Sequence, residues 1–224
     1  MRNVGVRKKY RAKEHYQNKR VAQQYDLVRF GSPLGKFVDR LEKTALRKAL
    51  KRAGRASVVL DIPCGTGRIT EFLLTQGYEV TGADISDEML EVAQRRLGSY
   101  PGFRGLVHQD AEHLDFQDKS FDFVVSSRFF GHLPSSTRIQ VLKEMGRVAQ
   151  EGVIVAYFIT DFLSRISKHI QRIGKKVDFV TYPVSMKNAN LEVDAADMKI
   201  LQIIPMCRRV SECYYFVLAP KERK

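Results

Sequence analysis

Short apolar runs alternate with amphipathic stretches along the middle of the chain. Three stretches, residues 68–77, 86–97 and 135–150, carry apolar positions at helical spacing. Strands and helices that alternate with short connections predict a doubly wound α/β fold, in which helices cover both faces of a parallel sheet. The predicted strands are rich in β-branched and aromatic residues and comprise residues 57–62, 78–84, 105–110, 121–127 and 152–159.

The two ends of the chain do not follow this alternation. Residues 14–30 and 34–50 predict helices, and the second of these has an apolar stripe on one side and basic residues on the other. Residues 161–174 predict a basic amphipathic helix. Residues 198–206 and 212–220 predict two late strands that pair antiparallel.

Length and composition indicate one globular domain with a small appendage. The chain has 224 residues, 44% of them hydrophobic, which is enough for a full-sized core. Its three cysteines, Cys64, Cys207 and Cys213, form no CxxC pair, and the first residues contain no apolar signal segment. No apolar run approaches the ~20 residues that a membrane-spanning helix needs. We therefore expect a cytoplasmic protein.

The positive charge is concentrated at one end of the chain. Residues 1–55 hold 17 Lys and Arg against 4 Asp and Glu, and this segment accounts for the whole net charge of +13. Such a segment can attract nucleic acid, anionic membrane or an acidic substrate. The alternative is a solvated basic face without a dedicated partner.

The segment LDIPCGTGRITEF, residues 60–72, places an acid and two glycines in a tight turn after the first strand. Gly65 and Gly67 allow the backbone to approach a ligand closely. A phosphate-binding P-loop is excluded because Arg68 and Ile69 follow Gly67, and the dinucleotide fingerprint is poor because Thr70 replaces its last glycine. A third interpretation is a loop for S-adenosylmethionine, whose cationic amino group would suit Asp61.

Acidic residues also end the next two strands. Asp84 ends the second strand, where a carboxylate can accept from both hydroxyls of a ribose. This holds for nicotinamide cofactors as well as for S-adenosylmethionine, so Asp84 alone does not separate them. Asp110 ends the third strand and can accept from an adenine amino group. Acids at three successive strand ends favour S-adenosylmethionine.

These residues carry a resemblance to a known family. The segments VLDIPCGTGR, VTGADISDEML and QDAEHLDFQDKSFDFVVSSRFFGHLP resemble the class I S-adenosylmethionine-dependent methyltransferases, in particular the branch of ubiquinone and menaquinone methyltransferases. The resemblance covers roughly residues 20–220 and is strongest over 57–158. It implies a seven-stranded Rossmann-like sheet of order 3-2-1-4-5-7-6 with strand 7 antiparallel, in a domain over residues 34–224 that follows a basic tail and lid helix over 1–33.

The resemblance also implies roles for individual residues. Asp84 is expected at the ribose, Asp110 and Ala111 at the adenine, and Ser126 under the methionine portion. The family usually has Gly where this chain has Pro63, which has no backbone N–H. The expected cofactor-binding residues are Asp61, Ile62, Pro63, Cys64, Gly65, Gly67, Asp84, Ile85, Met89, Asp110, Ala111, Glu112 and Ser126.

Fewer signals point to the methyl acceptor. His132 follows the fourth strand near the expected methyl group, where it orients or deprotonates the acceptor or instead only caps a loop. Arg128, Phe129 and Phe130 line the acceptor pocket, or the two phenylalanines belong to the core. Tyr25 and Arg29 belong to a lid over the cofactor, or their helix packs elsewhere. No spacing of His and Cys predicts a structural metal.

Three classes of function remain open. The first is transfer of a methyl group by in-line displacement to a small-molecule or lipid-linked acceptor. The second is an RNA or protein methyltransferase that docks through its basic segment, although SSRF stands where base-amine methylases show NPPY. The third is a non-catalytic partner subunit that binds S-adenosylmethionine. The sequence does not predict the acceptor, the methylated atom or the oligomeric state.

Overall fold

The computed structural model describes residues 18–53, 58–160, 182, 184–207 and 212–221. Helices and strands lie mostly where the sequence predicts them. The basic helix predicted over residues 161–174 and the tail over 1–13 lie outside the described residues.

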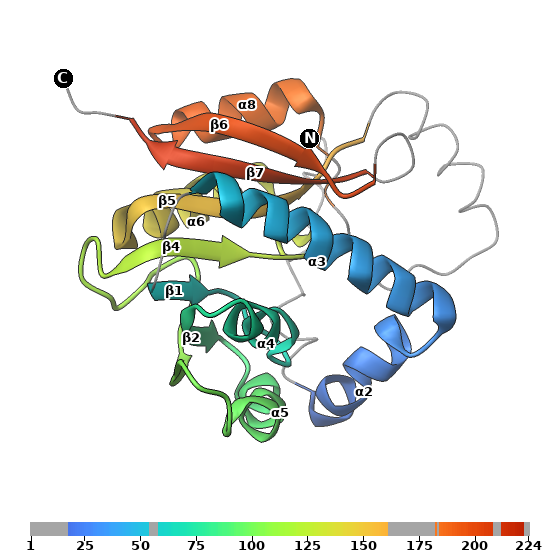
Figure 1. Ribbon diagram of the computed structural model, residues 1–224. Helices are drawn as coiled ribbons and strands as arrows, with labels where there is room; N and C mark the ends of the chain where they lie inside the picture. The colour runs from blue at the N-terminus through green and yellow to red at the C-terminus, as the bar shows by residue number, and fades with distance from the viewer. Residues whose placement is uncertain (1–17, 54–57, 161–181, 183, 208–211, 222–224) are drawn as a thin grey trace, which may run out of the picture.

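A seven-stranded sheet of order β3-β2-β1-β4-β5-β7-β6 forms the centre of the molecule (Figure 1). β7 runs antiparallel to both β5 and β6, whereas the pairs among the first five strands are parallel. The expected strand order and the antiparallel late pair are therefore confirmed. The strands are β1 (Val58–Asp61), β2 (Glu79–Asp84), β3 (Phe103–His108), β4 (Phe121–Ser126), β5 (Ala149–Phe158), β6 (Met198–Pro205) and β7 (Cys213–Pro220).

Helices cover both faces of the sheet. Their apolar residues divide between two core clusters: α3, α4 and α5 contribute to the cluster on one face, and α6 and α8 to the cluster on the other. α2 packs on α3 and α5 at the corner of the molecule (Figure 1). The helices are α2 (Lys19–Phe30), α3 (Pro33–Ala53), α4 (Arg68–Thr75), α5 (Asp87–Leu97), α6 (Ser135–Val148) and α8 (Met186–Ala195), with a short 3-10 helix η1 (Phe130–His132).

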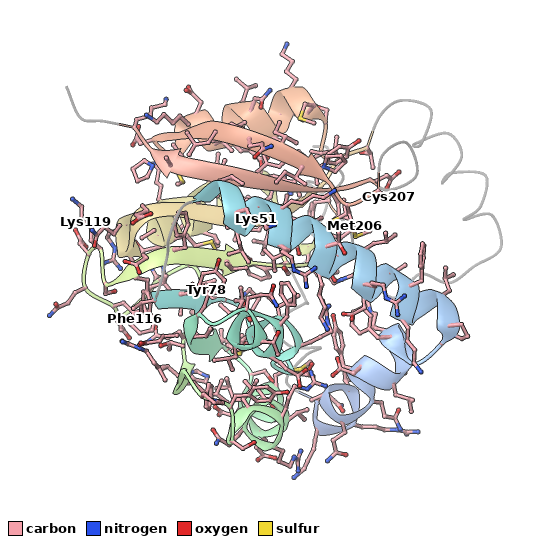
Figure 2. All side chains as sticks on the ribbon, in the orientation of Figure 1. Lys51, Tyr78, Phe116, Lys119, Met206 and Cys207 are labelled. Carbon is pink, nitrogen blue, oxygen red and sulfur yellow. The ribbon has the colours of Figure 1, made fainter. Side chains whose placement is uncertain are left out.

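The central strands are buried on both sides because consecutive residues face opposite clusters. In β1, Val59 belongs to the cluster under α3 and α4, while Leu60 belongs to the cluster under α6. Both side chains are fully buried. Side chains fill the space between the helices and the sheet (Figure 2). Burial on both faces explains why these strands are nearly continuous apolar runs.

The order of the strands determines where a ligand site can form. The chain adds β2 and β3 on one side of β1, and then β4 and β5 on the other. The turns after β1 and β4 therefore lie beside each other at the carboxyl edge of the sheet. Ligands in open α/β sheets bind at this kind of position.

One helix has no counterpart in the sequence analysis. α8 has only a short apolar stripe, and its buried face includes Glu192. That carboxylate accepts from Arg138 of α6, from Ser135 and from the hydroxyl of Tyr157 on β5. The pattern of apolar residues misses α8 because a charged partner distant in sequence makes Glu192 an interior residue.

Candidate functional site

The turn after β1, residues 61–67, is called here the glycine turn. Two backbone hydrogen bonds tie it to the neighbouring strands: Ile62 N–H donates to Val125 O at 2.9 Å, and Cys64 N–H to Ala83 O at 2.8 Å. Pro63 lies between these two donors and has no N–H of its own. The turn is therefore anchored to both β4 and β2 on either side of the proline.

The two glycines of the turn serve different purposes. Both have positive φ, +53° at Gly65 and +78° at Gly67, which favours glycine. A Cβ on Gly67 would lie 2.8 Å from Cδ1 of Leu97 and 3.2 Å from Cβ of Ala93, so this glycine allows α5 to pack closely. A Cβ on Gly65 would meet nothing within 4 Å, and Gly65 lines a cavity. Gly65 therefore leaves room for a ligand.

Asp61 lies fully buried behind the turn. Its Oδ2 accepts a hydrogen bond from Thr70 Oγ1 at 2.7 Å, whereas Oδ1 has no partner among the residues that the structure describes. Burial raises the pKa of this carboxyl to about 7. A buried acceptor without a donor is costly, and a cationic donor at Oδ1 would remove that cost.

Asp84 connects the glycine turn to the end of β2. Its two oxygens accept from the backbone N–H groups of Gly65 at 2.8 Å and Ser86 at 3.0 Å. Burial raises the pKa of this carboxyl as well, while these N–H donors favour its ionised form. Asp84 lines the same cavity as Gly65, so its carboxylate is available to a ligand there.

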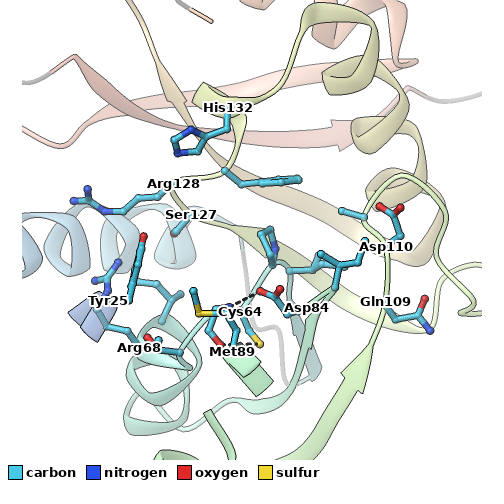
Figure 3. Close-up of a pocket in the computed structure, with 18 residues that line it drawn as sticks. Tyr25, Cys64, Arg68, Asp84, Met89, Gln109, Asp110, Ser127, Arg128 and His132 are labelled. Atoms are coloured by element: carbon cyan, nitrogen blue, oxygen red, sulfur yellow. Dashed lines mark hydrogen bonds between the residues drawn. The ribbon is translucent and has the colours of Figure 1, made fainter. Parts of the chain in front are cut away.

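The cavity lies along the carboxyl ends of β1 to β4 (Figure 3). Tyr25 and Arg128 lie at one end, and Gln109 and Asp110 at the other. Thirteen of the residues expected in the site line it: Tyr25, Ile62, Pro63, Cys64, Gly65, Asp84, Ile85, Met89, Asp110, Ala111, Arg128, Phe129 and His132.

Six expected residues do not line the cavity. Asp61 lies buried behind the glycine turn, and Gly67 caps α4. Arg29 lies on α2, with its guanidinium 5.5 Å from the ring centre of Tyr25. Glu112 donates its backbone N–H to Asp110 Oδ1. The remaining two are Ser126 and Phe130.

Ser126 is displaced by one residue from the position that reaches the cavity. It is the last residue of β4 and is fully buried, while Ser127 lines the cavity. Of the two phenylalanines expected in the acceptor pocket or the core, Phe129 lines the cavity, and Phe130 packs edge-on against Tyr157 in the core. The lining residues that the sequence analysis missed are Thr66, Arg68, Ile69, Gln109 and Ser127.

A buried carboxylate holds the two cavity arginines. Glu42 of α3 accepts from Arg68 Nη2 at 2.7 Å and from Arg128 Nε at 2.9 Å. Both guanidinium groups also lie over the ring of Phe30, at 4.2 and 5.2 Å from its centre. Arg68 further pairs with Asp39. α3 and the end of α2 therefore position the cationic end of the cavity, and neither arginine is freely mobile.

The helix that carries Tyr25 is joined to the glycine turn. Thr66 Oγ1 donates to Asp26 Oδ1 at 2.9 Å, and Arg96 of α5 donates both to Thr66 O and to the carboxylate of Asp26. Asp26 follows Tyr25 directly in α2. These contacts hold Tyr25 at the cavity.

The structure describes neither a metal cluster nor a membrane span. Within its described ranges, no three His, Cys, Asp or Glu residues gather to hold a metal ion. None of the helices in those ranges is long and apolar enough to cross a bilayer.

The sequence is similar to known methyltransferases over its middle part. Residues 59–152 match a family model described as "Methyltransferase domain". A demethylmenaquinone methyltransferase from Staphylococcus aureus is 37% identical over 114 residues, which is 49% of this chain and 46% of the relative. The chain thus matches about half the length of these curated relatives.

Solved structures extend the likeness to the whole fold. A protein from Pyrococcus horikoshii OT3 is 22% identical with a TM-score of 0.70, and the match covers 97% of this chain and 100% of that one. The magnesium protoporphyrin IX methyltransferase of Synechocystis, crystallised with S-adenosylmethionine, is 14% identical with a TM-score of 0.70 over 98% and 100% of the two chains. At these identities the likeness establishes the fold.

Residues 59–152 thus match a methyltransferase domain. The strand order is that of the class I S-adenosylmethionine-dependent methyltransferase fold.

Proposed function

We propose that the protein transfers a methyl group from S-adenosylmethionine to a small-molecule or lipid-linked acceptor. Oδ1 of Asp61 lies behind an open glycine turn and has no partner among the described residues. It carries this proposal, because a cationic ligand at that point would satisfy it. A relative named as a demethylmenaquinone methyltransferase supports a small-molecule acceptor. In this proposal residues 34–224 form the catalytic domain, and residues 1–33 contain the lid helix.

The cavity residues fit the cofactor from one end to the other. Gly65 leaves room for its methionine portion, whose amino group would approach the buried Asp61 behind the glycine turn, and Asp84 would accept from its ribose hydroxyls. Asp110 lies at the far end of the cavity (Figure 3), and the adenine would lie beside it and the lining residue Ala111. The cofactor supplies an electrophilic methyl carbon, and the protein supplies orientation and a water-poor surrounding.

The acceptor would enter at the other end of the cavity. Tyr25, Arg128 and Ser127 lie at this end (Figure 3), and His132 and Phe129 also line the cavity. Phe129 and Tyr25 suit an aromatic ring, and Arg128 would attract an anionic oxygen. His132 would orient an acceptor hydroxyl and take its proton as the methyl group is transferred.

Calorimetric titration with S-adenosylhomocysteine tests the cofactor site. We expect the wild-type protein to bind, and Asp84→Ala to bind at least tenfold more weakly, because both the ribose acceptor and the anchor of Gly65 are lost. Asp87→Ala is the matched control, since Asp87 lies three residues away with an 80% exposed side chain.

Two results would contradict the proposal. A folded wild-type protein that does not bind S-adenosylhomocysteine would lack the cofactor site. Binding without turnover of any quinol-like, lipid-linked or RNA acceptor would instead favour the non-catalytic partner subunit.

A further inference from the structure

Four large apolar side chains are exposed together where α2 meets α3. Leu27 and Val28 in the last turn of α2 are 74% and 76% exposed, and Leu34 and Phe37 at the start of α3 are 71% and 54% exposed. Only residues 31–32 separate the two helices. These four residues, called here the α2–α3 corner, concentrate an apolar surface that soluble proteins normally bury.

The charges around the α2–α3 corner are of one sign. Arg29 follows Val28, Lys36 lies between Leu34 and Phe37, and Arg40 lies one turn after Phe37, all of them exposed. Further exposed basic residues of α3 continue the same face toward Lys51 (Figure 2). The apolar residues therefore lie at the end of a basic helix face.

The acidic residues of these two helices do not neutralise this surface. α2 and α3 contain three of them, and all three are engaged on the inner side. Asp26 pairs with Arg96, Asp39 with Arg68, and fully buried Glu42 with Arg68 and Arg128. The positive charge of the outer face is thus left to an external partner.

We propose that the α2–α3 corner docks on an anionic phospholipid surface. Nucleic acid would satisfy the basic residues but offers nothing to three exposed aliphatic side chains. A second copy of the chain would bring its own basic residues against them. An anionic bilayer provides negative headgroups for Arg29, Lys36 and Arg40 and an apolar layer for the side chains between them.

Docking at this corner would bring the cavity to the membrane. Tyr25 lines the cavity and lies within one turn of Val28 on the same helix. Phe30, two residues after Val28, is packed against the cavity arginines. This inference rests on the proposed function, since it gives a lipid-linked acceptor a route from the bilayer to the acceptor end of the site.

Flotation with phospholipid vesicles tests the docking surface directly. The full-length protein should bind vesicles containing phosphatidylglycerol and fail to bind vesicles of phosphatidylcholine alone. The double variant Leu34→Ser/Phe37→Ser should bind at least tenfold more weakly, because two inserting side chains are lost. Leu191→Ser/Leu201→Ser is the control, because these residues on α8 and β6 are similarly exposed, at 57% and 55%.

Charge-reversal variants separate the electrostatic part of vesicle binding from the apolar part. Lys36→Glu/Arg40→Glu should weaken binding by about fivefold for each cation removed, and by more for the reversal of charge. Calorimetry with S-adenosylhomocysteine is run on every variant, so that loss of vesicle binding is distinguished from loss of the cofactor site.

Three outcomes would overturn the inference. They are vesicle binding that is unchanged in Leu34→Ser/Phe37→Ser, a wild-type affinity for RNA that exceeds its affinity for vesicles, and a dimer in solution that dissociates in that variant. The last two would assign the corner to nucleic acid or to a second copy of the chain.

Discussion

Thr66 Oγ1 lies 2.9 Å from Asp26 Oδ1 and donates its hydrogen to it. This contact joins two segments that are 40 residues apart, helix α2 and the glycine turn. Arg96 of α5 reinforces it by donating to the backbone carbonyl of Thr66 and to the carboxylate of Asp26. The position of Tyr25 at the cavity therefore depends on residues that also shape the cofactor turn.

Asp26→Asn should weaken cofactor binding without unfolding the protein. The substitution keeps the size of the side chain but removes the charge that Arg96 pairs with, so α2 is held less firmly. We expect the dissociation constant for S-adenosylhomocysteine to rise about tenfold, measured by calorimetry. Asp118→Asn removes an exposed carboxylate that pairs with Arg147 and should leave binding unchanged. Equal effects of the two variants would contradict a specific link between lid and turn.

Asp61 should make stability depend on pH. Burial raises its pKa to about 7, so the folded chain binds a proton there that the unfolded chain releases above about pH 4. Its stabilising contribution is complete below the unfolded pKa and is lost as pH rises through the folded pKa. Between pH 5 and 8, the unfolding free energy of the wild type should fall by about 2–3 kcal/mol relative to Asp61→Asn, measured by urea titration.

The same carboxyl provides a check on its role at the site. A cationic amino group beside Oδ1 would favour the ionised form, so binding of S-adenosylhomocysteine near pH 6 should release a proton. Calorimetry in buffers of different ionisation enthalpy measures this release. The release should disappear in Asp61→Asn. Equal numbers of protons released on binding by the wild type and by Asp61→Asn would argue against contact with the amino group.

Glu42→Gln should destabilise the fold strongly. The fully buried carboxylate balances Arg68 and Arg128, and its loss leaves two largely buried cations without that partner. Breaking a buried ion pair on one side costs about 3–5 kcal/mol, which a urea titration would detect. Glu79→Gln is the comparison, because Glu79 and Arg104 form a pair whose side chains are about half exposed, and such pairs contribute roughly 0–1 kcal/mol. A cost for Glu42→Gln as small as that of Glu79→Gln would show that the arginines are held by other contacts.

His132→Asn tests the proposed proton acceptor. With an acceptor hydroxyl in place, kcat should fall by about 10²–10⁴ while binding of S-adenosylhomocysteine is retained. The loss should shrink at high pH, where the acceptor ionises without help. Unchanged turnover would leave His132 with a structural role at the end of η1.

Most of the sheet could be predicted from the sequence because its physical signal is local. Strands such as Val58–Asp61 and Phe121–Ser126 are buried on both faces, so nearly every residue in them must be apolar. The spacing of Gly65 and Gly67 likewise follows from positive φ at both positions. α8 was missed because Glu192 becomes an interior residue only through Arg138, more than 50 residues away.

The candidate site was predicted less completely, for a geometric reason. The change from Ser126 to Ser127, and the division of Phe129 to the cavity and Phe130 to the core, depend on where β4 ends and on the positive φ of 56° at Arg128, which turns the chain. Neither the composition nor the periodicity of the sequence predicts a turn at an arginine. Neighbouring residues then face opposite sides, and a difference of one residue separates the core from the cavity.

By itself, the sequence determined which strands are buried, where the glycine turn lies and which strand ends carry acids, because each of these depends on neighbouring residues. Only the tertiary structure decided that Asp61 lies buried with one oxygen unpartnered among the described residues, that Glu42 holds the two cavity arginines and that Asp26 joins α2 to the glycine turn. These contacts connect residues 9–86 positions apart. They form only when the packed sheet and helices bring charged groups together away from water, where a missing or unpaired partner is costly.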